Sequence, residues 1–297
     1  MHIVYVSDGK AGHRSQALGL FQAVQRQQHN ADFQEVSIEK LSLLQLIKAI
    51  LTKSLPVFSS YPDMIIGVGS HTHFRVWLLG KVFPKAKTII LMKPSLPFSW
   101  FNYVVVPEHD GITASDHILI TQGALNPILN EHLHQPNLIL IALGGSSKHH
   151  QWNADKVLAS IAQIVEQNPL ADIILTTSRR TPFEFLDQLR QQSFARYLQI
   201  FPVEQTPQGW IFEQMQQAQA VWVTEDSVSM VYEALTAGCQ VGIILIDRLK
   251  QDRITHSIDL LLRQEIVSTV NKLEQLPQPR AFKEAERIAI EIIKDGL

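Results

Sequence analysis

Four segments of this 297-residue sequence combine glycine with hydroxyl, imidazole or charged side chains. They are residues 7–13, 67–73, 143–150 and 224–238. Each follows a short, β-branched apolar run and precedes a helical pattern. Ligands of open parallel sheets bind at the carboxyl ends of the strands, where loops of this kind lie. The four segments are therefore the first places to look for chemistry.

The first segment, Ser-Asp-Gly-Lys-Ala-Gly-His, contains two glycines three positions apart, Gly9 and Gly12. No third glycine follows, so the dinucleotide fingerprint Gly-x-Gly-x-x-Gly and the Walker pattern are both missing, which disfavours an NAD or ATP site. The loop brings His13 to a helix N-terminus, where an imidazole stays neutral and can act as a base. Asp8 is an alternative base. In the simpler interpretation, the glycines only make the turn and His13 is a surface cap.

The second segment is another glycine loop between a strand and a helix, and its backbone N–H groups can face an anion or a closely bound ligand. His71 and His73 are separated by one residue, a spacing that can indicate a metal site. A strand-to-helix turn directs two such side chains apart, and no nearby carboxylate completes a ligand set. We therefore expect no metal here.

The third segment, Leu-Gly-Gly-Ser-Ser-Lys-His-His, opens a predicted helix. Backbone N–H donors next to a hydroxyl group and a positive charge are typical of phosphate binding. The residues that would supply them are Gly144, Gly145, Ser146 and Lys148. The alternative is an ordinary turn with a serine helix cap.

A second phosphate-binding candidate in this half of the chain is the pair Arg179 and Arg180, which follows Ser178 and precedes a helix that starts at Pro182. A guanidinium group can hold a diphosphate through two parallel hydrogen bonds. From the sequence, either arginine could do so.

The fourth segment places Ser227 and Ser229 at a helix start, and Glu233 four residues after Ser229 on the same helix face. This geometry suits phosphates at the helix N-terminus and a carboxylate on two ribose hydroxyls. Glu225 and Asp226 add negative charge before the helix, as an N-cap or as ligands of sugar hydroxyls. In the alternative interpretation, Asp226 is the cap and Glu233 lies on the helix surface.

The elements that must position these loops alternate between strand and helix patterns, which predicts parallel sheets with crossover helices. We expect an α/β protein with two Rossmann-like domains facing a cleft, at residues 1–125 and 136–279, and a linker within 122–136. A C-terminal helix in segment 280–297 is expected to pack back on the first domain. The expected strands are 3–6, 33–38, 64–68, 88–91, 103–106, 137–142, 172–176, 199–201, 220–224 and 241–246, and the expected helices are 14–28, 42–53, 72–82, 154–167, 182–192, 209–217, 227–237 and 280–294.

The composition, with 45% hydrophobic residues, 18% charged residues and a formal net charge of -2, is that of a compactly folded protein. Nucleic-acid binders need a net basic surface, so we expect no nucleic-acid partner. The single Cys239 excludes an internal disulfide and a zinc–thiolate site. The first residues lack the pattern of a signal peptide, so we expect a cytoplasmic location. The apolar segment 41–51, which contains Lys48, could lie on a membrane surface or pack as a core helix.

Residues 7–13, 143–148, 177–182 and 224–230, taken together and in this order, resemble the family named for a plant mitochondrial-fission protein. The bacterial members of that family are taken to be GT-B glycosyltransferases, whereas the plant members are known for organelle division. The glycine loops and the helix from Ser227 to Glu233 also look, more remotely, like those of the transferase that adds N-acetylglucosamine to the cell-wall lipid precursor. A family resemblance supports fold more strongly than activity.

The resemblance implies a GT-B architecture in which the C-terminal domain binds the donor and the N-terminal domain binds the acceptor. The donor side would then contain Gly144, Gly145, Ser146, Lys148, Ser178, Arg179, Arg180, Ser227, Ser229 and Glu233. The acceptor-side loops would contain Gly9, Lys10, Gly12, Gly69, Ser70 and His71.

The function expected from these residues is transfer of a sugar from a nucleotide-diphosphate-sugar donor to an acceptor hydroxyl, with inversion and with His13 or Asp8 as base. No carboxylate pair suits a metal, so we expect neither a metal nor another cofactor. The acceptor would be a glycan or a lipid-linked molecule of the cell envelope, with peripheral contact at the inner face of the membrane left open. The alternatives are a non-catalytic binding or recruitment protein, or a sugar-nucleotide epimerase, for which the sequence offers no convincing acid–base pair.

Overall fold

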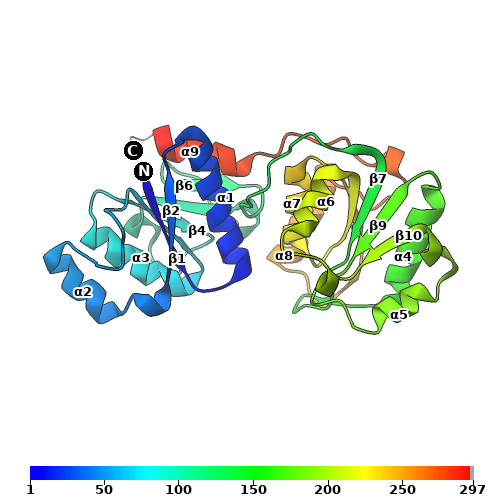
Figure 1. Cartoon of the computed structure of the whole chain (residues 1–297), viewed down its shortest axis with the longest axis horizontal. Helices are drawn as coiled ribbons and strands as arrows, with labels where there is room; N and C mark the ends of the chain where they lie inside the picture. Colours follow the sequence, from blue (N-terminus) through cyan, green and yellow to red (C-terminus); the bar gives the residue numbers. More distant parts are fainter. Residues whose placement is uncertain (295–297) are drawn as a thin grey trace. The chain divides into compact units, whose positions relative to one another are not determined.

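Residues 1–294 are described by a computed structural model, in which the chain forms two compact units. Unit 1 comprises Met1–Pro127 and the segment from Lys283 onward, and unit 2 comprises Ile128–Phe282. The chain thus leaves unit 1, completes unit 2 and returns to unit 1 for its last helix (Figure 1).

Unit 1 is built on a six-stranded, all-parallel sheet with the strand order β2-β1-β3-β4-β5-β6. Its strands are β1 (His2–Ser7), β2 (Asp32–Ser37), β3 (Met64–Val68), β4 (Lys87–Leu91), β5 (Tyr103–Pro107) and β6 (Ile118–Thr121). A parallel sheet covered on both faces needs apolar residues on both sides of its strands. Every residue of β1, β3 and β5 is buried, as this arrangement requires.

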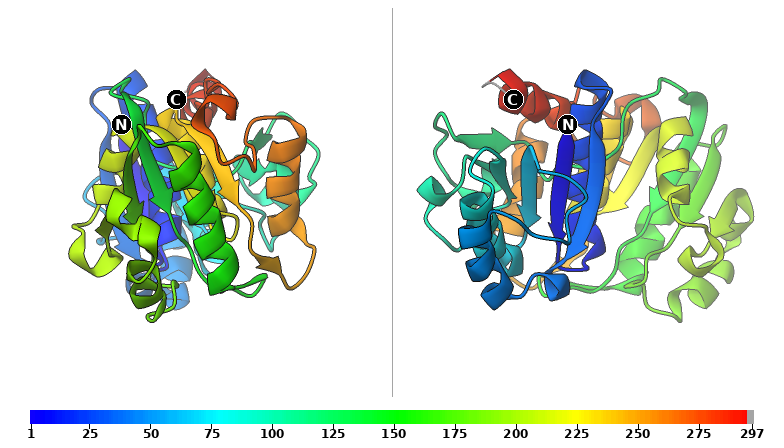
Figure 2. Two further views of the ribbon diagram at one scale, coloured as in Figure 1. Left: turned by 90° about the vertical axis from the view of Figure 1, so that its right-hand side faces the viewer. Right: turned by 60° about the vertical axis from the view of Figure 1, so that its left-hand side comes forward.

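Two layers of helices cover this sheet. Its helices are α1 (Ala11–Gln27), α2 (Leu43–Thr52), α3 (Ser70–Val82) and α9 (Glu284–Lys294). Successive strand residues point to opposite faces: Ile3 and Tyr5 of β1 join the core under α1 and α9, whereas Val4 and Val6 join the core under α2 and α3. The C-terminal helix α9 lies beside α1 (Figures 1 and 2). Residues 295–297 of the predicted C-terminal segment lie outside the described residues.

Unit 2 is built on a five-stranded parallel sheet with the order β10-β9-β7-β11-β12. These strands are β7 (Gln135–Ala142), β9 (Asp172–Thr176), β10 (Leu198–Phe201), β11 (Ala218–Thr224) and β12 (Gln240–Ile244). A short antiparallel pair joins β8 (His150–Gln151) to β13 (Asp247–Arg248). Helices α4 (Ala154–Gln167) and α5 (Phe185–Arg190) pack in one core, and α6 (Trp210–Gln217), α7 (Val228–Ala237) and α8 (Arg253–Arg263) pack in the other.

Short 3₁₀ helices lie between these elements, at Ile38–Lys40, Phe98–Trp100, Glu108–Asp110, Ser193–Tyr197, Val203–Gln205 and Leu273–Gln275. No helix within residues 1–294 is both long enough and apolar enough to cross a membrane.

The predicted α/β fold of two Rossmann-like domains is confirmed, but some element predictions were wrong. The helix expected at 182–192 is shorter, because it begins only at Phe185. The strand expected to end at Ile246 ends at Ile244. Strand β6 was missed although Ile118–Thr121 begins with three consecutive apolar residues; it is a short edge strand whose residues are mostly half-buried.

Helix α8 was also missed, although the sequence contains its start signal. Asp252 forms a capping box in which its carboxylate accepts from the Ile254 N–H and its own N–H donates to Thr255 Oγ1. Ile258 and Leu261, three residues apart, are buried on one helix face.

Candidate functional site

A histidine–carboxylate pair lies at the carboxyl end of β1 in unit 1. Nδ1 of His13, in the first turn of α1, is 2.9 Å and 3.0 Å from the two carboxylate oxygens of Asp8. The Asp8 side chain is only 2% exposed and the His13 side chain 16%. A carboxylate only accepts hydrogen bonds, so Nδ1–H donates. Nε2 of His13 has no hydrogen-bond partner within residues 1–294 and is left available as a base.

The electrostatics of the pair favour an ionised Asp8. Burial by itself would raise the pKa of this carboxyl group, but the hydrogen bond from His13 and the charges of His13 and Lys10 hold the pKa below its usual value. The Lys10 ammonium lies 3.5 Å from the carboxylate. Asp8 is therefore suited to orienting the imidazole rather than to taking a proton itself.

The second glycine loop of unit 1 lies against this imidazole ring. A Cβ atom at Gly69 would be 2.4 Å from Cε1 of His13, and Gly69 has a φ of 83°, so only glycine suits this position. Ser70 and His71 are exposed at the start of α3, and neither side chain makes a hydrogen bond to the described residues. His73 is buried, and burial together with the charge of His13 lowers its pKa to about 4.

The first glycine loop is open to solvent. Gly9, Lys10 and Gly12 are exposed, and a Cβ atom at either glycine would meet no atom within 4 Å. The predicted acceptor-side residues thus fall into two groups: Gly69 packs on the His13 ring, whereas the others are exposed.

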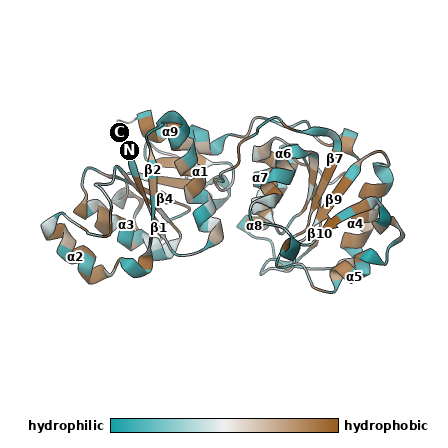
Figure 3. Cartoon of the chain, viewed as in Figure 1, coloured by the Kyte–Doolittle hydropathy of each residue, from teal (hydrophilic) through white to brown (hydrophobic). Residues whose placement is uncertain are grey.

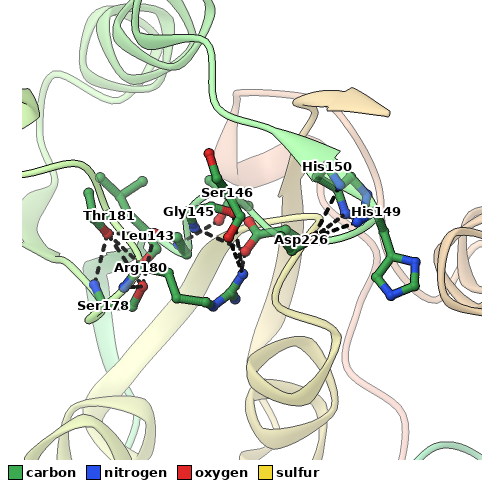
Figure 4. Close-up of polar contacts among 12 residues, drawn as sticks. Leu143, Gly145, Ser146, His149, His150, Ser178, Arg180, Thr181 and Asp226 are labelled. Atoms are coloured by element: carbon green, nitrogen blue, oxygen red, sulfur yellow. Dashed lines mark hydrogen bonds and ion pairs between the residues drawn. The ribbon is translucent and has the colours of Figure 1, made fainter. Parts of the chain in front are cut away.

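The Gly144–Gly145 loop of unit 2, in contrast, is closed by the protein itself (Figure 4). The Gly144 N–H donates to Thr224 Oγ1 at 2.6 Å, and the Gly145 N–H donates to Asp226 Oδ2 at 3.0 Å. A Cβ atom would lie 2.2 Å from Asp226 Oδ2 at Gly144 and 1.9 Å from the Arg180 carbonyl oxygen at Gly145. Packing therefore requires both glycines, and neither N–H is left for a ligand.

The two neighbouring arginines have different environments. Arg180 donates to the carbonyl oxygens of Gly145 and Ser146 at 3.3 Å and pairs with Asp226 at 2.7 Å. Arg179 is exposed and has no partner among residues 1–294. Arg180 thus fixes the loop, and Arg179 is the guanidinium group left free for a ligand.

The remaining predicted residues of this loop region divide in the same way. The hydroxyl groups of Ser178 and Thr181 donate hydrogen bonds to the Gly144 carbonyl oxygen, and these bonds hold the loop in place. Ser146 Oγ accepts from the Trp152 N–H. Lys148 is exposed and has no partner within the described part of the chain.

The start of helix α7 carries backbone N–H groups that no protein group satisfies in the described residues. Its N-cap, Ser227, makes no side-chain cap hydrogen bond, and the first turn contains no acidic residue. The N–H groups of Val228, Ser229 and Met230 have no partner within residues 1–294. Unpaired N–H groups at a helix N-terminus attract anions.

Glu233 lies on α7, half-buried and without a hydrogen-bond or ion-pair partner in residues 1–294. Burial raises its pKa to about 8. A partly buried carboxyl group without a protein partner is able to accept hydroxyl groups of a ligand.

The sequence interpretations of Glu225 and Asp226 were wrong, because neither is the cap of α7 and both are buried in protein contacts. Asp226 holds Gly145 and Arg180, and Glu225 accepts from the Ile246 N–H and pairs with Arg248 at 2.8 Å. Their charges are thus compensated by two arginines. The part played by Arg248 was missed, since nothing local in the sequence links it to Glu225.

A further pair missed from the sequence joins His149 to Asp252 at 2.6 Å. Burial of the Asp252 carboxyl group opposes ionisation, but hydrogen bonds from backbone N–H groups and His149 lower its pKa to about 2. No cluster of three or more His, Cys, Asp or Glu side chains suited to a metal occurs in residues 1–294.

Two parallel-sheet units with polar loops at their strand ends define the class as a two-domain α/β protein with Rossmann-like units. Residues 11–295 match the model of the family described as mitochondrial fission ELM1, and the chain belongs to this family. It is 24% identical to uncharacterized protein RP120 of Rickettsia prowazekii (strain Madrid E), over all of this chain and 99% of the relative.

Solved structures show the same fold at low sequence identity. A UDP-GlcNAc 2-epimerase from Methanocaldococcus jannaschii matches with a TM-score of 0.52 and 14% identity over 100% of both chains. MurG from Acinetobacter baumannii matches with a TM-score of 0.51 and 14% identity, over 99% of this chain and 90% of that one. A UGT transferase from Siraitia grosvenorii in complex with UDP matches with a TM-score of 0.50 and 12% identity, over 99% and 90%.

Proposed function

We propose that this protein is a glycosyltransferase that moves a sugar from a nucleotide-diphosphate-sugar to an acceptor hydroxyl, with inversion and without a metal. The observation that carries the proposal is the Asp8–His13 pair, which leaves Nε2 of a held imidazole free at the end of β1. A base of this kind is what activation of a hydroxyl nucleophile needs.

In the proposed reaction, Nε2 of His13 takes the proton of the acceptor hydroxyl while the hydroxyl oxygen bonds to the anomeric carbon. The bond from that carbon to the donor phosphate oxygen breaks, and its electron pair leaves with the nucleoside diphosphate. Attack from the face opposite the leaving group inverts the anomeric configuration. Asp8 keeps Nδ1 protonated and stabilises the imidazolium ion that forms.

The donor would bind to unit 2 at the residues that remain free of protein contacts. The N–H groups at the start of α7 and the side chain of Arg179 would stabilise the departing diphosphate. Glu233 would accept the ribose hydroxyls. The nucleotides named for the similar structures, UDP-GlcNAc and UDP, support a donor of this class.

We further propose that the acceptor is a glycan or lipid-linked molecule of the cell envelope, used in the cytoplasm at the inner face of the membrane. An exposed apolar surface on unit 1 supports membrane contact and is described in the next subsection.

The test is to incubate the protein with UDP-, ADP- and GDP-sugars labelled in the sugar, in the presence of EDTA, with and without a membrane lipid extract as acceptor source. The proposal requires transfer of label to the extract, lost on His13→Ala. Label that stays on the nucleotide but changes to an epimeric sugar without acceptor would favour an epimerase. No turnover and no nucleotide binding would favour a non-catalytic recruitment protein.

A further inference from the structure

Helix α2 exposes an apolar stripe that the fold does not cover. Only Leu46 and Ala49 of its ten residues are buried. The exposed apolar side chains are Leu43 (40%), Leu44 (72%), Ile47 (53%) and Leu51 (88%). Positions 43, 47 and 51 are four residues apart and so lie along one side of the helix. Figure 3 shows hydrophobic residues recurring along α2. The segment therefore packs in the core through Leu46 and Ala49, as one interpretation of the sequence allowed, and also exposes an apolar stripe.

The neighbouring helix α3, which packs against α2 over the same sheet face, adds exposed aromatic rings. Phe74 stacks on Trp77 with centroids 5.4 Å apart, and Trp77 stacks on Trp100 at 4.6 Å. Phe74 and Trp100 are each 40% exposed. Tryptophan rings are favoured at membrane–water interfaces because they are apolar with a polar edge. We call the α2 stripe and these rings, two on α3 and one, Trp100, on the segment Phe98–Trp100, the α2–α3 surface.

The segment of the chain that contains α2 and α3 is rich in basic residues. The stretch from Lys40 to Lys93 contains eight of the 26 basic residues of the chain but only one of its 28 acidic residues, Asp63. Exposed lysines without a carboxylate partner in the described residues are Lys40, Lys48, Lys53, Lys81, Lys85 and Lys93. In a protein with a net charge of -2, the segment that contains the apolar stripe is thus basic, with Lys48 on α2 and Lys53 at its C-cap, although the exposed Glu39 directly precedes Lys40.

We propose that the α2–α3 surface docks on an anionic lipid membrane, with the α2 stripe at the boundary between headgroups and acyl chains and the lysines against anionic headgroups. Apolar side chains flanked by lysines are the composition of interfacial helices. An exposed apolar surface of this kind marks an interaction site.

Charge and hydrophobicity together distinguish this partner from others. Self-association through a two-fold interface would bring the unpaired lysines of one copy against those of the other. A nucleic acid would satisfy the lysines but offers little to cover leucines that are 72% and 88% exposed. Anionic lipid provides both kinds of contact.

The proposal is tested with the full chain, without donor or acceptor, so its outcome is independent of the transferase reaction. The protein is floated with vesicles of phosphatidylcholine alone or with about 30% phosphatidylserine, at low and high salt. We expect binding to the anionic vesicles that weakens with salt, and little binding to the neutral ones.

The apolar contribution is tested with Leu44→Ser/Leu51→Ser. Both side chains are largely exposed, so the variant should fold, and we expect its vesicle partition coefficient to fall about tenfold or more. The matched control is Leu170→Ser in unit 2, because Leu170 is also 88% exposed; its partition coefficient should not change.

The charge contribution is tested with Lys48→Gln and Lys53→Gln, each expected to lower binding to anionic vesicles about fivefold. The control is Lys283→Gln, which removes an exposed lysine from outside the surface. Absence of vesicle binding by the wild-type protein, or equal losses in variants and controls, would overturn the proposal. A wild-type dimer that the leucine variant dissociates, without vesicle binding, would assign the surface to self-association instead.

Discussion

The loops that follow the first strand of each unit contain similar residues, but their glycines have different uses. In residues 7–13 of unit 1, Gly9 and Gly12 have no neighbouring atoms where a side chain would project, and the loop displays a histidine held by Asp8. In residues 143–150 of unit 2, other protein atoms fill the space where a side chain of either glycine would project. The two N–H groups donate hydrogen bonds to Thr224 and Asp226.

This difference between the two loops shows that a glycine-rich loop at a strand end is not by itself a ligand site. In unit 2 the loop is a framework that fixes Arg180 and Asp226, and the groups left for a ligand lie beside it, on Arg179 and at the start of α7. In unit 1 the loop itself carries the candidate chemistry.

The largest effect is expected at the open loop. His13→Ala should lower sugar transfer about 100- to 10,000-fold, because the general base is lost, while nucleotide affinity stays nearly constant. His29→Ala is the matched control, since His29 is exposed, its side chain makes no hydrogen bond to the described residues, and it lies outside the predicted loops. Initial rates and a nucleotide titration measure the two quantities. Full turnover by His13→Ala would show that the Asp8–His13 pair takes no part in the reaction.

The next effect concerns stability at the closed loop. Gly145→Ala should lower the free energy of unfolding of unit 2 by about 3 kcal/mol or more, because its Cβ would overlap the Arg180 carbonyl oxygen. Gly12→Ala, in the open first turn of α1, should change stability by less than about 0.5 kcal/mol or raise it. Hydrogen exchange of β7 and β1 in increasing urea follows each unit. Equal free energies of unfolding for the two variants and the wild type would contradict the difference between the closed and the open loop.

We expect the two adjacent arginines to have different roles: Arg180 stabilises unit 2, and Arg179 binds the nucleotide. Arg180→Ala should destabilise unit 2 by about 1 to 3 kcal/mol, a range that allows for its 41% exposed side chain, because the buried Asp226 loses its partner. Arg179→Ala should leave stability unchanged and weaken nucleotide binding by about 1.5 to 3 kcal/mol. Urea unfolding and calorimetric titration of the same variants separate the two losses, and the reverse pattern would exchange the assignments.

The smallest effect is a pH dependence. Burial raises the pKa of Glu233 from 4.5 to about 8, so between these pH values the unfolded chain releases a proton that the folded chain keeps. This contribution makes stability fall as pH rises through that window, and Glu233→Gln should remove the fall. The full shift would be worth about 4 kcal/mol at pH 8, of which solvent at this half-buried carboxyl group leaves only a fraction. Asp8 has the opposite sign, because its lowered pKa stabilises the fold above the unfolded value and is lost in acid. Urea midpoints from pH 4 to 9 give both slopes; a Glu233→Gln slope like that of the wild type would contradict the carboxyl assignment.

Local signals were sufficient for much of the fold. The sequence predicted the bounds of β3, β9 and α4 correctly. A buried strand is recognised by an apolar run between turn residues, and an amphipathic helix by its apolar face, and both patterns involve residues that are close in the sequence. The Asp8–His13 pair was within reach for the same reason, since its members are five residues apart.

The role of the second glycine loop could not be predicted in this way. The contacts that close it come from Arg180 and Asp226, which are 35 and 81 residues from Gly145. A sequence shows that glycine is present but not whether a ligand or the protein fills the space beside it. The same limit applied to the choice between Arg179 and Arg180, which depends on which side chain reaches Asp226.

Amide hydrogen exchange on adding UDP tests most directly where the donor phosphates bind. Saturating UDP should slow exchange at Val228, Ser229 and Met230, whose N–H groups are free, and leave Gly144 and Gly145 unchanged, because theirs are already bonded within the protein. Slowed exchange at the two glycines without protection of α7 would contradict the account, as would the absence of any protection with UDP, ADP and GDP.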